Sequence, residues 1–290
     1  MYLLRRDLAQ QVAKSRRLKF IHIAWVLLSS LPLSAVGMDF FWGPGPLALS
    51  KGNRDDFLYL SGDIRAGDFA KFVEFMRTNW PKYQMSPRLV VLSSNGGSLV
   101  ETVKIAGLLR QMYAGVHVVG DKCASSCFFL FLSGTFRYSE PAKLGVHRAY
   151  FAQDFFAGLP PTQAQKRQSE LTAAVRRMLD ESGVPQFLVD RVNATSSAEI
   201  YWLTTDDLER LGMRPAWYEE LLIAKCAFDK RLEEQFRSTP RGATQYDAIR
   251  AAYVANSRGV AECEAELSEP ELVRLGSRLS SGKFNATQPR

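Results

Sequence analysis

The chain has 290 residues, enough to bury the core of one α/β domain and an appendage. Its composition, 46% hydrophobic and 23% charged, is that of an ordinary globular protein and excludes a largely disordered chain. The formal net charge is +7, but six basic residues and one acidic residue within positions 1–37 contribute +5, which leaves +2 for the rest. We therefore do not expect nucleic acid as a partner.

The N-terminal segment is typical of an exported protein. Its basic residues precede an apolar run, Phe20 to Leu33, and small residues follow at 35–37. This pattern predicts a secretory signal over residues 1–37, with cleavage after Gly37. An uncleaved anchor is the alternative, since residues 20–38 come close to the ~20 that a bilayer span needs; a true start further along the chain is another. In each case we expect a periplasmic body, either free or tethered to the inner membrane.

The body begins after a segment rich in glycine and proline, so residues 38–56 are predicted to be a linker. Hydrophobic periodicity and turn residues then predict strands at 57–61, 89–92, 116–119, 137–138 and 144–147. Helices are predicted between them at 68–80, where Pro81 ends the helix, at 99–112 and at 127–132, the last after a turn at 121–126. From residue 150 the pattern is helical, over 162–182, 185–193 and 204–211, with two or three amphipathic helices between 217 and 279.

This alternation predicts an α/β fold, with a parallel sheet and crossover helices over residues 57–216, and a helical C-terminal extension over 217–290. In such sheets ligands bind at the carboxyl ends of the strands. Leu99, Val100, Val103 and Ile105 begin the second helix and are predicted to lie in the core.

The chain has four cysteines, an even number that fits an oxidising compartment. Cys123 and Cys127 would be about 6 Å apart between Cα atoms on a helix, within disulfide range, although two buried thiols are an equal alternative. We expect Cys226 and Cys263 to pair and staple the C-terminal helices. There is no zinc-ligand spacing and no Gly-x-x-x-x-Gly-Lys-Ser/Thr phosphate loop, so neither a metal nor another cofactor is expected.

Three short segments could do chemistry together. Gly96-Gly97 follows a predicted strand, Ser125 lies in a turn before a helix, and His147 ends a later strand. A serine hydroxyl becomes a nucleophile when a base takes its proton and backbone N–H groups stabilise the oxyanion. Each segment alone has an ordinary structural interpretation, as a turn, a helix cap and a structural histidine. Their combination at strand ends favours catalysis.

These segments resemble a known family. Leu92-Ser93-Ser94-Asn95-Gly96-Gly97-Ser98, Cys123-Ala124-Ser125-Ser126-Cys127 with Gly134, and Gly145-Val146-His147 are similar to the Clp protease proteolytic subunit and its crotonase-like superfamily. They resemble more closely the exported bacterial branch with a Cys-Ala-Ser-x-Cys elbow. The resemblance covers about residues 57–213 and implies a parallel sheet of ββα-type repeats and a homo-oligomer.

The resemblance also implies roles for individual residues. Ser125 would be the nucleophile, His147 the general base, and the backbone N–H groups of Gly97 and Ser126 the oxyanion hole. Ser126 is the rival nucleophile and Cys123 a weaker one, whereas His117 is interpreted as structural.

The third member of a catalytic triad departs from the family pattern. The stretch that matches the family's aspartate places Ile200 at that position, and isoleucine cannot orient an imidazole. Glu199 is adjacent, although neighbouring strand residues face opposite ways, and Asp190 lies upstream on another predicted helix. A Ser–His dyad, a displaced acid or an inactive site all remain open.

Taken together, the sequence predicts an exported, ATP-independent serine peptidase acting on peptides or unfolded proteins. The first alternative is a catalytically inactive binding or assembly module with the same fold. A weaker alternative, from the crotonase link, is an acyl-thioester hydrolase.

Overall fold

The computed structural model describes residues 37–45, 56–86, 88–151, 153–282 and 284. These described residues belong to one compact unit, which begins at Gly37. The predicted export signal and tether lie outside the described residues, except for Gly37 and Met38.

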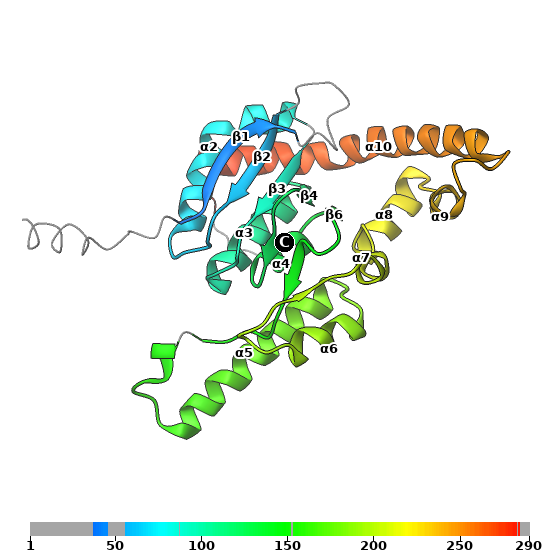
Figure 1. Cartoon of the computed structure of the whole chain (residues 1–290). Coiled ribbons are helices and arrows are strands. Elements are labelled where there is room, and N and C mark those ends of the chain that lie inside the picture. Colours follow the sequence, from blue (N-terminus) through cyan, green and yellow to red (C-terminus); the bar gives the residue numbers. More distant parts are fainter. Residues whose placement is uncertain (1–36, 46–55, 87, 152, 283, 285–290) are drawn as a thin grey trace, which may run out of the picture. The chain divides into compact units, whose positions relative to one another are not determined.

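A five-stranded sheet forms the centre of this unit (Figure 1). It contains, in spatial order, β1 (Asp39–Pro44), β2 (Asp56–Ser61), β3 (Leu89–Ser93), β4 (Gly115–Val118) and β6 (Phe136–Ser139). β1 runs antiparallel to β2, and the remaining neighbours are parallel. The crossover helices α2 (Asp68–Met85) and α3 (Leu99–Gln111) connect successive parallel strands. The predicted α/β class with a parallel sheet is therefore confirmed.

A smaller sheet carries the segments of chemical interest. It consists of β5 (Cys123–Ala124), β7 (Leu144–Val146) and β8 (Tyr201–Trp202), in the order β5-β7-β8. β5 pairs with β7 in parallel, and β7 pairs with β8 in antiparallel. The short helix α4 (Cys127–Leu132) begins directly after the turn that follows β5.

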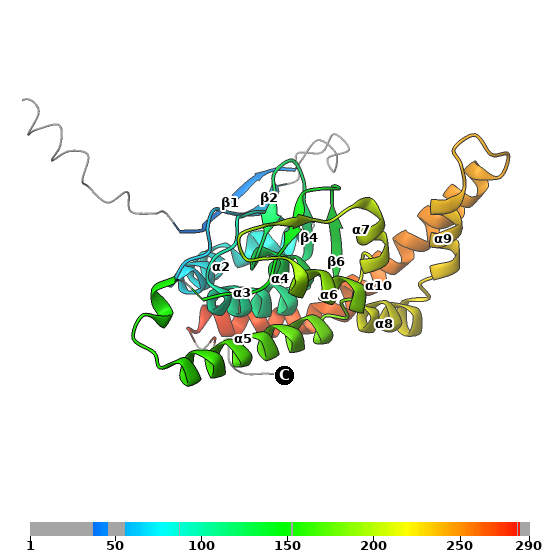
Figure 2. The same cartoon turned by 60° about the horizontal axis from the view of Figure 1, so that its bottom comes forward.

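Strand alternation determines which side of the large sheet faces the core. Leu60, Leu92 and Val116 are fully buried and belong to the same hydrophobic cluster as Phe72 of α2 and Ile105 of α3. Figure 2 shows α2, α3 and α10 (Tyr246–Ser280) on the same side of the sheet. The helices packed on this side of the sheet hold in place the strand ends at which the candidate site lies.

Apart from β8 and its connections, the regular structure described after β7 is helical, and the predicted C-terminal helices are confirmed. The elements are the 3-10 helix η1 (Gln153–Phe156), α5 (Pro161–Glu181), α6 (Gln186–Ala194), α7 (Thr205–Leu211), α8 (Ala216–Cys226), α9 (Lys230–Ser238) and α10. Leu272, Leu275 and Leu279 of α10 are buried in the main hydrophobic cluster. The C-terminal part of α10 is therefore packed into the core of the sheet domain.

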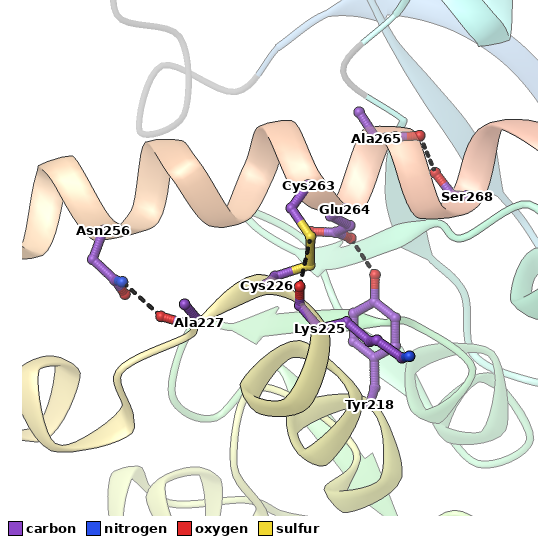
Figure 3. The surroundings of a disulfide bond; sticks show 9 residues. All are labelled: Tyr218, Lys225, Cys226, Ala227, Asn256, Cys263, Glu264, Ala265 and Ser268. Atoms are coloured by element: carbon purple, nitrogen blue, oxygen red, sulfur yellow. Dashed lines mark hydrogen bonds between the residues drawn. A yellow bond between two sulfur atoms is a disulfide. The ribbon is translucent and has the colours of Figure 1, made fainter.

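The two predicted cysteine pairs are at disulfide distance. Cys226 of α8 is bonded to Cys263 of α10, and the Tyr218 hydroxyl donates a hydrogen bond to Glu264 beside the bridge (Figure 3). Burial is the largest cause that raises the pKa of Tyr218 above its ordinary value.

Three local expectations were wrong. The expected linker over 38–56 contains β1, because the side chains of Phe40 and Trp42 both lie on the face of the sheet that the helices cover. Pro44 is tolerated because it lies at the end of an edge strand. α2 continues through Pro81 to Met85, because Trp80 and Tyr83 continue its buried face. Cys123 lies on β5 and not on a helix, with its Cα 5.3 Å from that of Cys127.

Within the described ranges, no helix combines the length and the apolar character required to cross a membrane.

Candidate active site

The glycine turn after β3 lies directly beside Ile64. Ile64 N–H donates to the Gly96 oxygen at 2.9 Å, and Ser98 N–H donates to the Ile64 oxygen at 2.8 Å. Gly97 has a φ of +141°, and a Cβ there would lie 2.1 Å from the Ile64 oxygen, so only glycine fits. The Gly97 N–H has no acceptor among the described residues, whereas its neighbours are bonded.

Ser125 occupies a tight turn between β5 and α4. Its φ is +59°, a left-handed conformation that non-glycine residues adopt only when the surroundings enforce it. Ser125 N–H donates to the Gly145 oxygen at 3.0 Å, and Ala124 N–H donates to the Ser94 oxygen at 2.9 Å. The fully buried Cys123–Cys127 bridge closes the turn from both sides. These ties hold the hydroxyl at the surface of a rigid elbow.

His147 follows β7 and is half-buried. Its Nδ1 lies 2.8 Å from the main-chain oxygen of Arg148. A carbonyl oxygen only accepts hydrogen bonds, so Nδ1 carries the ring proton in the neutral imidazole. The lone pair is then on Nε2, where it can accept a proton.

One pocket, with a volume of about 730 Å³, brings these segments together. Gly96, Gly97, Ser125, Ser126 and His147 all line it. The Ser126 N–H, like that of Gly97, has no acceptor in the described part of the chain. No hydrogen bond joins the Ser125 hydroxyl to His147 within these residues.

The predicted acids are not brought to the imidazole. Asp190 accepts a hydrogen bond from Gln186 at 2.6 Å, and Glu199 is exposed; neither lines the pocket. Among the described side chains, no carboxylate is bonded to His147. Ile200 lines the pocket, and the β7–β8 register, continued by one residue, would pair it with His147.

The rival nucleophiles are less available than Ser125. The Ser126 Oγ is buried and has no hydrogen-bond partner among the described residues, while Ser125 is only half-buried. The Cys123 sulfur is held in the disulfide, so it offers no thiolate. Ser125 therefore has the best access to a bound substrate.

His117 lies on β4, between the rings of Phe136 and Tyr138, and does not line the pocket. Burial lowers its pKa to about 4.

Sequence reasoning did not identify the apolar walls of the pocket. Several elements supply them: Ile64, Leu99, Val100, Phe128, Phe129, Val146, Leu171, Val175, Val192 and Ile200. Leu171 and Val175 lie on α5 with Leu179 one turn further on, and this spacing of four residues was the available signal. Asp63 and Arg65 also line the pocket and form an ion pair at 3.0 Å.

Among the described residues, no group of three or more His, Cys, Asp or Glu side chains could hold a metal ion.

No protein-family model matches this chain, and neither does any curated protein. Among solved structures, a mutant of the 1510-N membrane-bound stomatin-specific protease is similar in part. It shares 17% sequence identity, and the match covers 58% of this chain and 82% of that chain with a TM-score of 0.38. A likeness of this size assigns no activity, so the function is argued from the site itself.

Proposed function

We propose that this chain is a serine hydrolase, most specifically an ATP-independent peptidase. One observation carries the proposal. A hydroxyl on a left-handed turn, an imidazole with a free Nε2 and two amides without acceptors line a single pocket. The resemblance of the three motifs to the Clp protease proteolytic subunit supports the same chemistry.

In the proposed reaction, the Ser125 Oγ attacks the carbonyl carbon of the substrate while His147 Nε2 takes the hydroxyl proton. The developing oxyanion accepts hydrogen bonds from the Gly97 and Ser126 N–H groups. The imidazolium then gives the proton to the leaving amine, and water hydrolyses the acyl-enzyme by the reverse sequence. Ser125 and His147 must come within hydrogen-bond distance when substrate binds, a contact that is often loose in the free enzyme.

The Arg148 carbonyl takes over part of the usual role of the acid. It holds the imidazole in the tautomer whose Nε2 can act as a base, but it carries no negative charge to stabilise the imidazolium. The expected enzyme is therefore a slow Ser–His dyad.

The pocket walls favour an unfolded peptide with an apolar side chain beside the scissile bond. We further propose that the protein works outside the cytoplasm as a homo-oligomer. The two disulfides are consistent with an oxidising compartment.

The proposal is tested by labelling the full chain with a fluorescent fluorophosphonate, which forms a covalent bond with an activated serine. The wild type should react, Ser125→Ala should not react, and His147→Gln should react slowly. Ser126→Ala is the matched control and should still react, because its hydroxyl is buried. Labelling that persists in Ser125→Ala, or that never occurs in the wild type, would refute the proposal.

A second candidate function is a binding or assembly module without catalysis. It is favoured by the missing acid and by the absence, within the described residues, of a Ser125–His147 hydrogen bond. In that case the wild type would remain unlabelled, yet would bind peptides as tightly as Ser125→Ala does.

A further inference from the structure

A second pocket, with a volume of about 470 Å³, adjoins the candidate active site. Four residues line both pockets: Ala149, Tyr150, Val175 and Ser197. A peptide bound across Ser125 can therefore extend from the first pocket into the second. The residues that line only the second pocket are Arg148, Gln168, Thr172 and Asn193.

The second pocket differs from the first in its chemistry. The residues that line it include Arg148, Gln168, Asn193 and Ser197, whose side chains carry a guanidinium, two amides and a hydroxyl. In the described part of the chain, none of these groups has a hydrogen-bond or ion-pair partner. No carboxylate lines this pocket, so its donors are left for a ligand.

The charged residues that line the two pockets also favour a negatively charged ligand in the second pocket. Arg65 in the first pocket is neutralised by Asp63 at 3.0 Å. Arg148 is thus the one arginine or lysine lining either described pocket without a carboxylate partner. A planar guanidinium flanked by amide and hydroxyl donors is suited to binding a carboxylate through paired hydrogen bonds.

We infer that the second pocket is a carboxylate-binding subsite. As a statement about catalysis, this rests on the proposed hydrolase function. The substrate would present an apolar side chain next to Ser125 and a carboxylate further along the chain. That carboxylate belongs either to an aspartate or glutamate side chain or to the peptide's C-terminus.

Arg148 connects the two pockets. Its main-chain oxygen accepts the hydrogen bond from His147 Nδ1, which lines the first pocket, and Arg148 itself lines the second pocket. Arg148 is therefore the residue that determines the preference for a carboxylate in the bound peptide.

The test measures binding by fluorescence anisotropy to full-length Ser125→Ala, which cannot turn over a substrate. The probes are fluorescein-labelled peptides of Leu, Ala and Gly with an amidated C-terminus. A single Asp is moved along the peptide, and each probe is compared with its Asn counterpart. A third set carries Asn and a free C-terminal carboxylate.

At the best position, the Asp peptide should bind about tenfold more tightly than the Asn peptide, the usual size of a charge-assisted hydrogen bond. Adding Arg148→Gln should bring the two affinities together. Adding Lys166→Gln is the matched control. It removes one exposed positive charge from the same region, outside both pockets, and should leave the ratio unchanged. A preference for the free C-terminus alone would identify the terminal carboxylate as the ligand.

Equal affinities at every position and with the free C-terminus, a ratio that survives Arg148→Gln, or no binding of any probe would overturn the inference. Because these measurements use a variant without the proposed nucleophile, they are independent of fluorophosphonate labelling. If the wild type is labelled but Ser125→Ala shows no carboxylate preference, the proposed function stands and the subsite is refuted. If Ser125→Ala shows the carboxylate preference but the wild type is not labelled, the subsite stands and the proposed hydrolase function is refuted.

Discussion

Gly96 packs so closely against Ser125 that a Cβ at position 96 would lie 2.7 Å from the Cβ of Ser125. The same atom would lie 2.7 Å from the Ala124 oxygen and 2.9 Å from the Ser126 nitrogen. The glycine turn at Gly96 and the elbow at Ser125, 29 residues apart in the chain, therefore form one packed unit. The position of the hydroxyl depends on this contact.

Gly96→Ala should disrupt the elbow. Its φ of +96° and the three close contacts should together lower the free energy of unfolding by about 2–3 kcal/mol, and fluorophosphonate labelling should be lost. Gly67→Ala is the matched control, since φ is +91° there but nothing lies within 4 Å of the added methyl group. It should cost only about 1 kcal/mol and retain labelling. Urea denaturation measures both variants, and equal losses would contradict the packing argument.

The two disulfides should contribute in different ways. Cys226 and Cys263 are 37 residues apart, so replacing both with serine should lower the free energy of unfolding by about 4 kcal/mol through loop closure. Cys123 and Cys127 are only four apart, and replacing both with alanine should cost about 2 kcal/mol. The short bridge closes the elbow, however, so its removal should reduce labelling more than removal of the long one.

Denaturant unfolding and labelling rates of the two double variants check this contrast. A short-bridge variant that labels at the wild-type rate would show that hydrogen bonds alone hold Ser125.

The sequence predicted the parallel sheet and its crossover helices because the buried strands are short apolar runs between glycine-containing turns. It could not predict β1, whose Phe40 and Trp42 gain their role only by packing against α2. Nor could it predict that α2 would pass through Pro81, since the buried Trp80 and Tyr83 outweigh the lost hydrogen bond. In both segments, tertiary packing outweighed the local conformational preference of the sequence.

The sequence motifs of the candidate site could be predicted from the sequence, but the residues that form the walls of its pocket could not. Val100 was expected in the core but is 66% exposed and lines the pocket, because helix periodicity does not say which apolar residues face a cavity. The second pocket was also missed, because Arg148, Gln168 and Asn193 come from three separate segments.

His117 should make the protein less stable in mild acid. Burial lowers its pKa from 6.5 to about 4, so the unfolded chain binds this proton at a higher pH than the folded chain does. As the pH falls from about 6.5 towards 4, the free energy of unfolding should therefore fall, by up to about 3 kcal/mol.

Urea unfolding at about pH 7 and pH 4.5 tests this pH dependence. His117→Phe and His117→Leu should both lose less stability in acid than the wild type, since neither can take up the proton. The same acid loss in the wild type and in both variants would exclude His117 as its source.

Ile200→Asp should accelerate the proposed reaction. The β7–β8 register, continued by one residue, places position 200 opposite His147, where cross-strand Cβ atoms are about 5 Å apart. A carboxylate there can accept from the imidazole and stabilise its cation, two effects that the neutral Arg148 carbonyl supplies only in part. Ile200 is 37% exposed, so the substitution should cost less than about 1 kcal/mol of stability. We expect fluorophosphonate labelling at least about tenfold faster than in the wild type.

Ile200→Asn is the matched control, with nearly the same shape as Asp and no charge, and should give little acceleration. Equal rates in the Asp and Asn variants would mean that a carboxylate at this position does not reach His147, and that the imidazole works through the Arg148 carbonyl alone.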